Sequence, residues 1–273
     1  MNKQELLKDY KRQEDKICLS QVLDKIEFSK TRNKIETTDF LDMYQISLVE
    51  NFLKKIKFTE YKLYGGYEDA ERRQVIFVPD YIPVAGEEDI IRYFRENPDD
   101  CPMVILNAEI RQKGASLRHS DYLGSLMALG IKREKIGDII VSEKGAQIFV
   151  CREIAPYMAE NYFKAGNVSL TAKILPVSQQ IIAKADIKKL KSVIPSPRLD
   201  NIAAAAFDIS RKAATEAISR GLVFVDNIET KKPDHFLKGG EKIVLRGKGK
   251  VIFIGLCGTS RKGKLYAEID RYI

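Results

Sequence analysis

The stretch RLDNIAAAAFDISRKAATEAISRGLVFVD (198–226) decides the fold of the C-terminal part of the chain. Residues 198–207 are rich in alanine, the residue with the highest helix propensity, and predict a short helix. Ser210 is a good N-cap for a second helix at 211–220, and Gly221 supplies its C-terminal stop. The stretch therefore predicts two short helices followed by a strand.

The residues on either side of this stretch complete a small domain. After the strand LVFVD (222–226), Asp226-Asn227 forms a turn, and short strands punctuated by glycine continue to the end. Before it, DIKKLKSVIPSPRLD (186–200) contains two prolines and several lysines and predicts a junction. We therefore expect a C-terminal domain over residues 181–273.

The positive charge of the chain is concentrated in this last third. The whole chain has a net charge of +8, and residues 186–273 hold 18 Lys or Arg against 10 Asp or Glu. The remainder is balanced, with 28 of each sign. A localised basic field is typical of proteins that bind polyanions, although a soluble surface that is simply basic is the alternative.

Two cations stand where helix stability does not favour them. Arg211 and Lys212 lie in the first turn of the second predicted helix, near the positive end of its dipole. Unpaired N–H groups and cations together suit a phosphate. Arg198 opens the first helix, close in sequence to the same corner. Any one of them could be a solvated surface cation, but the set indicates phosphate binding.

A family resemblance covers more than 50 residues here. R-L-D at 198–200, S-R at 210–211, A-x-x-x-I-x-x-G at 214–221, V-x-V-D-N at 223–227 and K-x-G-E-x-I from 238 occur in order. This pattern resembles the RNA-binding domain named after ribosomal small-subunit protein S-four, with Glu241 where that family usually has Asp. The resemblance implies a small ααβ-type domain whose two helices and adjoining turn contact structured RNA. The implied RNA-binding residues are Arg198, Asp200, Ser210, Arg211, Lys212 and Thr215, flanked by Lys232, Arg246, Lys248 and Lys250.

The tail adds further cations. Arg261, Lys262 and Lys264 lie on a glycine-bounded loop within GTSRKGKLYAEIDRY (258–272) that could reach phosphates without reading bases. A disordered hairpin tip is the alternative.

Residues 1–64 predict a helical segment. LDMYQISLVENFLKKI (41–56) places Leu41, Tyr44, Leu48, Phe52 and Ile56 at helical spacing, and Thr38 or Asp39 is the expected N-cap.

Residues 65–180 predict an α/β sandwich of the ferredoxin-like or RRM-like kind, which gives an α+β fold class for the whole chain. Helix 120–130 is expected to begin at the cap Ser120 and to stop at Gly130, and the turn Glu143–Gly145 separates two strands. KGAQIFVC (144–151) has an RNP1-like outline, but Ala146 and Cys151 replace its outer aromatics, which favours a plain core strand. The expected strands are 72–82, 101–110, two within 136–153 and 167–175, with a second helix at 154–166.

Upstream motifs resemble the YlmH family of bacterial proteins. They are TDFLD (38–42), GGYEDAERRQ (65–74) and HSDYLGSLMALGIKREKIGDI (119–139). The resemblance implies a non-enzymatic factor that binds the large ribosomal subunit carrying stalled peptidyl-tRNA, in ribosome quality control, with a link to cell division. It implies large-subunit rRNA and the ribosome as partners and tRNA as a further candidate. No small-molecule substrate is expected.

Two other functions stay open. An RNA-modifying enzyme would have its catalytic domain in 63–175, with His119, Asp121 and Asp138 as candidates, although the sequence lacks a pseudouridine-synthase context, a glycine-rich methyltransferase turn and a P-loop. A division-linked scaffold would bind other proteins instead. Neither a signal peptide nor a membrane-spanning run is present in the sequence, and the four cysteines form no CxxC pair. We therefore expect a cytosolic protein that needs no metal or other cofactor.

Overall fold

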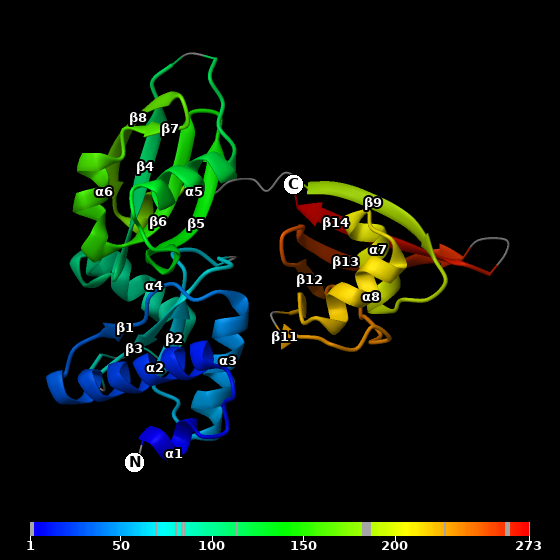
Figure 1. The fold of residues 1–273 in the computed structure, drawn as a ribbon, viewed down its shortest axis with the longest axis horizontal. Coiled ribbons are helices and arrows are strands. Elements are labelled where there is room, and N and C mark those ends of the chain that lie inside the picture. The colour runs from blue at the N-terminus through cyan, green and yellow to red at the C-terminus, as the bar shows by residue number, and fades with distance from the viewer. Residues whose placement is uncertain are drawn as a thin grey trace. The chain divides into compact units, whose positions relative to one another are not determined.

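The computed structural model describes residues 3–68, 70–79, 81–82, 84, 86–112, 114–181, 187–226, 228–259 and 263–272. The chain forms two compact units, Met1–Ala183 and Lys184–Ile273, each described here by itself (Figure 1). Helices and strands are mixed in both, as the α+β expectation requires. None of the described helices is long and apolar enough to cross a membrane.

The N-terminal part of the first unit packs helices on a small sheet of order β1-β3-β2. Residues 1–64 are therefore less uniformly helical than expected, and the strand expected at 72–82 pairs with these strands rather than with the central sheet. The elements are α1 (Lys3–Leu7), α2 (Gln13–Arg32), β1 (Glu36–Thr37), α3 (Met43–Lys55), β2 (Tyr61–Tyr64) and β3 (Gln74–Phe77).

The expected N-cap of α3 is wrong. Asp42 caps the helix, because its carboxylate accepts from the Gln45 backbone N–H at 2.9 Å while the Gln45 side chain accepts from the Asp42 N–H at 3.0 Å. Thr38 instead uses its hydroxyl to accept from the Val75 N–H at 3.0 Å, which fastens the connecting segment to β3.

A five-stranded antiparallel sheet of order β5-β6-β4-β8-β7 forms the rest of this unit. The sequence β4-α5-β5-β6-α6-β8 in this spatial order is the ferredoxin-like arrangement, which confirms the predicted sandwich. The elements are α4 (Glu87–Glu96), β4 (Met103–Ile110), α5 (His119–Ala128), β5 (Ile136–Ser142), β6 (Gly145–Cys151), α6 (Ala155–Asn161), β7 (Lys164–Ala165) and β8 (Val168–Leu175), with short 3-10 turns at Pro98–Asp100, Arg133–Lys135, Arg152–Ile154 and Val177–Gln179.

Local signals around α5 are partly confirmed. Gly130 has φ +80° and follows the helix directly, as a C-terminal stop should. The expected cap Ser120 is wrong, since Arg118 is the N-cap and the Asp121 carboxylate accepts its backbone N–H at 2.7 Å.

The sheet face that RRM proteins use for RNA is covered in this unit. Phe149 of β6 is fully buried and packs with Tyr64, Phe94 and Ile105 in one apolar cluster. Its ring lies close enough to Gly66 that a Cβ there would stand 2.3 Å from it. The RNP1-like strand is therefore a core strand, as expected, and Phe149 offers no surface for a base.

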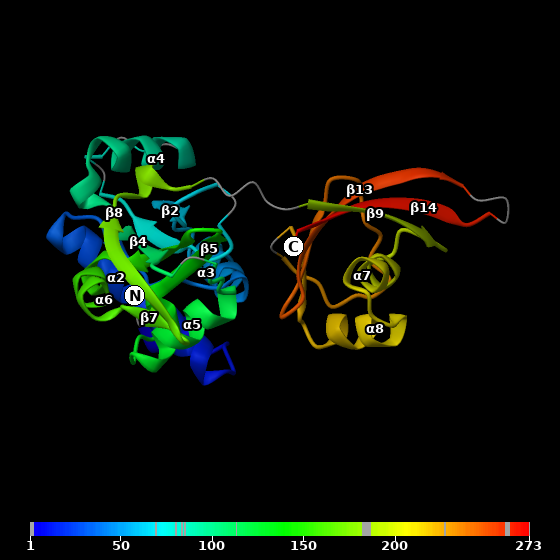
Figure 2. The same cartoon turned by 90° about the horizontal axis from the view of Figure 1, so that it is seen from above.

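The second unit is a six-stranded antiparallel sheet of order β11-β10-β12-β13-β14-β9 with both helices on one face (Figure 2). The two helices and the first strand agree with the sequence: Ser210 caps the second helix, and Gly221 follows it at φ +72°. The elements are β9 (Ile187–Ile194), α7 (Leu199–Phe207), α8 (Arg211–Ser219), β10 (Val223–Val225), β11 (Ile228–Glu229), β12 (Lys242–Leu245), β13 (Gly249–Thr259) and β14 (Leu265–Tyr272).

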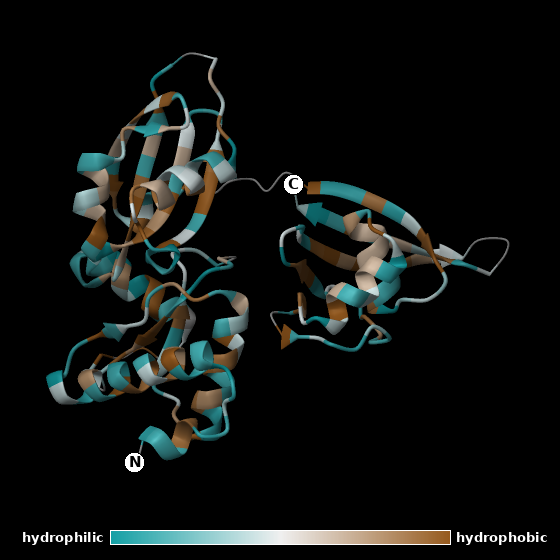
Figure 3. Ribbon diagram, viewed as in Figure 1, coloured by the Kyte–Doolittle hydropathy of each residue, from teal (hydrophilic) through white to brown (hydrophobic). Residues whose placement is uncertain are grey.

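The expected junction at 186–200 is a strand over much of its length. β9 pairs with β14 over eight residues, from Ile187↔Tyr272 to Ile194↔Leu265. It is one of the two edge strands of this sheet, and hydrophilic and hydrophobic segments alternate along it (Figure 3). Lysines on an edge strand oppose pairing with a second chain. This role explains why β9 is rich in lysine, although the same lysines suggested a junction between domains in the sequence.

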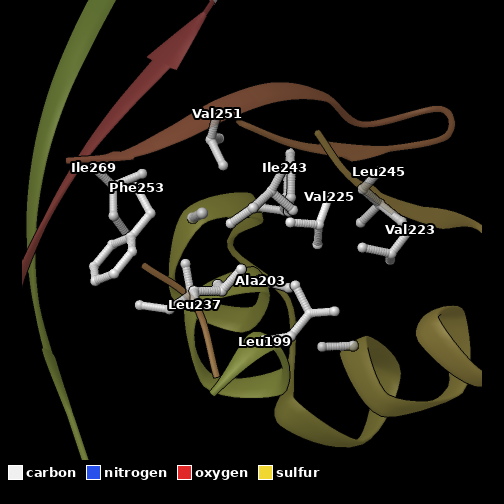
Figure 4. Packing of buried hydrophobic residues seen from close by; sticks show 14 of the residues in the cluster. Leu199, Ala203, Val223, Val225, Leu237, Ile243, Leu245, Val251, Phe253 and Ile269 are labelled. Carbon is white, nitrogen blue, oxygen red and sulfur yellow. The ribbon is translucent and has the colours of Figure 1, made fainter. Parts of the chain in front are cut away.

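The core of this unit lies between the helices and one sheet face. Leu199 and Ala203 of α7 meet Val225, Ile243 and Phe253 of the sheet (Figure 4). Burying a Leu, Val, Ile or Phe side chain contributes about 1.5–3 kcal/mol, so this layer holds α7 in place.

Candidate RNA-binding site

Asp200 is the centre of the candidate site. It lies in the first turn of α7, and only 3% of its side chain is exposed. Its carboxylate accepts from Nε and Nη2 of Arg198, both at 3.2 Å, and from Nε and Nη2 of Arg211, at 3.0 and 2.8 Å. One buried carboxylate therefore holds two guanidiniums that remain 33% and 55% exposed.

The ionised form of Asp200 is favoured in the folded protein. Burial raises the pKa of Asp200, whereas hydrogen bonds from Arg211 and Arg198 and the positive charges of both lower it. The lowering outweighs the effect of burial, so the pKa lies below the ordinary value of an aspartate. The carboxylate is thus charged at neutral pH. It acts as an anchor for the arginines and is too buried to be a direct RNA contact, although the family resemblance implied an RNA-binding residue.

This pairing corrects one argument from the sequence. Arg211 does have a structural reason to begin α8, because its ion pair with Asp200 ties α8 to α7. Its cost near the helix dipole is offset by a charge-assisted hydrogen bond. Lys212, by contrast, is exposed and makes no such pair among the described residues, so the phosphate argument applies to it more directly.

The two helix starts differ in their backbone amides. At α7, the N–H groups of Leu199 and Asp200 donate to the carbonyls of His235 and Pro233, at 2.8 and 3.0 Å. These amides are unavailable to a phosphate. At α8, Ser210 accepts the Ala213 N–H at 3.1 Å through its hydroxyl, which leaves the first amides of that helix as the better anion site.

Phe236 is a residue that the sequence argument missed. It forms an isolated antiparallel bridge with Arg198 and is 63% exposed. Side chains of a bridge pair lie on the same side, about 4.5–5.5 Å apart at Cβ. The bond from the Leu237 N–H to the Pro197 carbonyl, 2.9 Å long, fixes this loop beside α7. No local signal in the sequence places Phe236 beside Arg198, because the two residues are 38 positions apart and meet only through this bridge.

The remaining residues that the sequence predicts to bind RNA lie on different elements of the second unit. Thr215 is half-buried on α8, Lys232 is exposed on the loop before Phe236, and Lys248 is exposed in the turn between β12 and β13. Lys264 is exposed just before β14, whereas Arg261 and Lys262 lie outside the described residues.

Arg246 and Lys250 do not join the α7–α8 face. Arg246 stands 5.9 Å from the ring of Phe224, and Lys250 stands 4.2 Å from the ring of Tyr272. Phe224 and Tyr272 alternate with residues that face the helix-side core, so they point to the opposite face of the sheet. The site therefore consists of a helix face around Asp200 and a separate set of sheet cations.

Two of the three alternative catalytic residues, Asp138 and Asp121, have structural roles. Asp138 accepts from the Tyr67 hydroxyl at 2.8 Å and from the N–H groups of Glu71 and Arg72 at 2.7 and 3.1 Å. The Asp121 carboxylate accepts the Arg118 N–H at the start of α5, and His119, the first residue of that helix, is exposed. Across the part of the chain that the structure describes, no three His, Cys, Asp or Glu side chains gather to hold a metal.

Comparisons with known proteins match two separate regions of the chain to protein families. Residues 97–179 match the family model "Putative RNA-binding domain in YlmH", and residues 197–243 match the model "S4 domain". A relative from Bacillus subtilis (strain 168), "Ribosome-associated protein quality control protein P2", is 26% identical over 260 residues, which cover 95% of this chain and 96% of that protein. The matched families are RNA-binding families and not catalytic ones.

A solved structure, "Cell division protein ylmH from Streptococcus pneumoniae", is 19% identical with a TM-score of 0.48, over 63% of this chain and 97% of that one. This structural likeness is weak. The more specific findings are the order of the two matched domains and the Bacillus relative, which aligns with the chain over nearly its whole length. The chain thus carries a domain similar to the one in YlmH, followed by a C-terminal S4 domain, and it is similar to the Bacillus relative over 95% of its length.

Proposed function

We propose that this protein is a ribosome-associated RNA-binding factor whose α7–α8 face docks on structured RNA of the large subunit. It acts in quality control of stalled peptidyl-tRNA complexes, with tRNA as a further contact, and it works in the cytoplasm without catalysing a reaction. The observation that carries the proposal is the pair Arg198 and Arg211, ordered by buried Asp200. The matched S4 domain and the name of the Bacillus relative support it.

The geometry explains why a folded RNA is the expected target. Two guanidiniums on adjacent helix starts have a fixed spacing, so they fit phosphates that the RNA itself holds at a matching spacing. Because their orientation is set before binding, little side-chain entropy is lost on contact. Phosphate contacts also release counterions, and binding should therefore weaken steeply with salt.

The experiment is ribosome co-sedimentation of the full chain carrying Arg198→Ala and Arg211→Ala. We expect most association to be lost at moderate salt. Lys34→Ala with Lys54→Ala is the matched control, since it removes the same charge from exposed positions in the helical N-terminal part. We expect this control to sediment as the unaltered protein does.

A charge-conserving variant distinguishes loss of the RNA contact from misfolding of the domain. Arg198→Lys with Arg211→Lys keeps both charges beside Asp200 but loses the planar fork, so it should bind at an intermediate level. Hydrogen exchange of the α7 and α8 amides reports whether each variant is folded. Undiminished association of a folded Arg198→Ala, Arg211→Ala protein would show that this face is not the ribosome contact.

A further inference from the structure

The helix-free face of the C-terminal sheet has an unusual composition. Residues that point away from the α7–α8 core are identified by strand alternation and register, because Val223, Val225, Ile243, Val251 and Ile269 all belong to that core. No described helix of this unit covers the opposite face (Figure 2). The residues on this opposite face, here called the outer sheet face, are Phe224, Lys242, Val244, Arg246, Lys250, Ile252, Tyr266, Glu268, Asp270, Tyr272, Ile187, Lys189, Lys191 and Val193.

Aromatic rings and cations are paired across the outer sheet face. The Lys191 ammonium lies 5.3 Å from the Tyr266 ring centroid, and the Lys250 ammonium lies 4.2 Å from that of Tyr272. With Arg246 over Phe224, three of the cation–π contacts in the structure belong to this one face. Phe224 is buried, but Tyr266 and Tyr272 are only half-buried and remain accessible.

The charge of the outer sheet face is positive overall. Lys189, Lys191, Lys242, Arg246 and Lys250 oppose two carboxylates, Glu268 and Asp270. In register, Lys191 is opposite Glu268 and Lys189 is opposite Asp270. The ammonium of Lys191 nevertheless lies over the ring of Tyr266, and such cation–π contacts are weak at exposed sites. A ligand with phosphates and bases can therefore displace these lysines from the rings at small cost.

We propose that the outer sheet face binds a single-stranded segment of RNA, a second contact that rests on the proposed RNA-binding function. Proteins recognise unpaired nucleotides with cationic side chains that contact the phosphates and with accessible aromatic rings on which the bases stack. Tyr266 and Tyr272 accept bases, and Lys189, Lys191 and Lys250 contact the backbone. The domain then holds structured RNA on its helix face and an unpaired strand on its sheet face.

The test measures binding of the full chain to two fluorescent probes, an oligouridine of about 12 nucleotides and a hairpin RNA with a fully paired stem. Tyr266→Leu with Tyr272→Leu removes stacking but keeps apolar bulk, and Lys191→Gln with Lys250→Gln removes charge. Each pair should weaken oligouridine binding about 10-fold or more, since stacking and phosphate contacts are both lost. Lys34→Gln with Lys54→Gln is the matched control and should leave oligouridine binding unchanged.

A variant of opposite sign completes the test. Glu268→Gln with Asp270→Asn removes the two carboxylates, so it should tighten oligouridine binding about 5-fold or more. Circular dichroism and thermal unfolding check that the variants are folded. If folded variants of both signs bind oligouridine as the unaltered protein does, the outer sheet face is not an RNA site. Selective loss of a protein partner by the same variants, with RNA binding intact, would equally overturn the proposal.

Failure of this inference is distinguishable from failure of the proposed function. If only the sheet contact is wrong, the hairpin still binds and still depends on Arg198 and Arg211. If neither probe nor the ribosome binds the unaltered protein, the proposed function itself is wrong.

Discussion

Replacing Asp200 by asparagine separates two explanations of the basic site, because they predict opposite changes in RNA affinity. If the site were only a positive field, removing a negative charge would tighten RNA binding. If Asp200 positions the arginines, asparagine loosens Arg198 and Arg211, and RNA binding weakens. We expect a loss of about 5- to 10-fold.

The stability cost follows from the contacts. The carboxylate is 3% exposed and accepts four N–H bonds at 2.8 to 3.2 Å. Removing one partner of a fully buried ion pair costs about 3–5 kcal/mol, but both guanidiniums reach solvent, so their contribution is screened. We expect the free energy of local opening of α7 and α8 to fall by about 2 kcal/mol, which speeds amide exchange about 30-fold.

The difference between the unaltered protein and Asp200→Asn should depend on pH. The folded-state pKa of Asp200 lies below its unfolded value, so the carboxylate contributes stability above about pH 4. That contribution is lost as the pH falls through the folded pKa. The gap in opening free energy should therefore be full near neutral pH and shrink under acid.

Asp208→Asn is the matched control. Asp208 is exposed and ends α7 at φ +53°, a conformation that asparagine also adopts readily. It removes the same charge without touching the arginines, so RNA binding should be unchanged or slightly tighter. Amide exchange of Asp200→Asn within twofold of the unaltered protein, together with tighter RNA binding, would refute the positioning role.

Three further predictions concern other residues. Ser210→Ala should lower the local stability of α8 by about 1 kcal/mol through loss of the cap, measured by amide exchange, whereas Ser219→Ala at the other end of the helix should have almost no effect; equal effects would contradict the capping argument. Phe236→Ala should weaken binding of the hairpin RNA several-fold in a fluorescence titration and leave the thermal midpoint unchanged, because the ring lies beside Arg198 and is 63% exposed; unchanged affinity would remove Phe236 from the site. Gly66→Ala should destabilise the first unit by about 3 kcal/mol or more, since φ is +96° and the new Cβ would stand 2.3 Å from Phe149, while Gly124→Ala, which meets open space in α5, should be neutral or stabilising in the same thermal scan; a mild Gly66→Ala would show that the Phe149 cluster is looser than described.

The elements that the sequence predicts well depend on local signals. Ser210, the alanine-rich run at 199–207 and Gly221 all act within a few residues of one another, and they mark both C-terminal helices correctly. The succession of strands and two helices along the central region also indicates its ferredoxin-like sandwich, which the structure confirms.

The elements that it misses depend on partners distant in the chain. β9 is a strand because β14, more than 70 residues later, supplies its hydrogen bonds. Its lysines and the prolines that follow it are typical of a junction, so the sequence alone does not predict the strand. β3 likewise pairs with the N-terminal strands, which no local pattern indicates.

The site shows the same limit. The sequence selects Arg198, Asp200 and Arg211, but the burial of Asp200 and the bonds to both arginines arise only when α7 packs beside α8. The placement of Arg246 and Lys250 on the outer sheet face requires the register of four strands, and charge counting cannot supply it.

A crosslinking map of RNA bound to the full chain in cells shows whether the α7–α8 face contacts ribosomal RNA. We expect crosslinks to large-subunit rRNA, from peptides of α7 and α8 around Arg198 and Arg211, that disappear in the folded Arg198→Ala, Arg211→Ala protein. Crosslinks that avoid ribosomal RNA, or that persist unchanged in this variant, would contradict this contact.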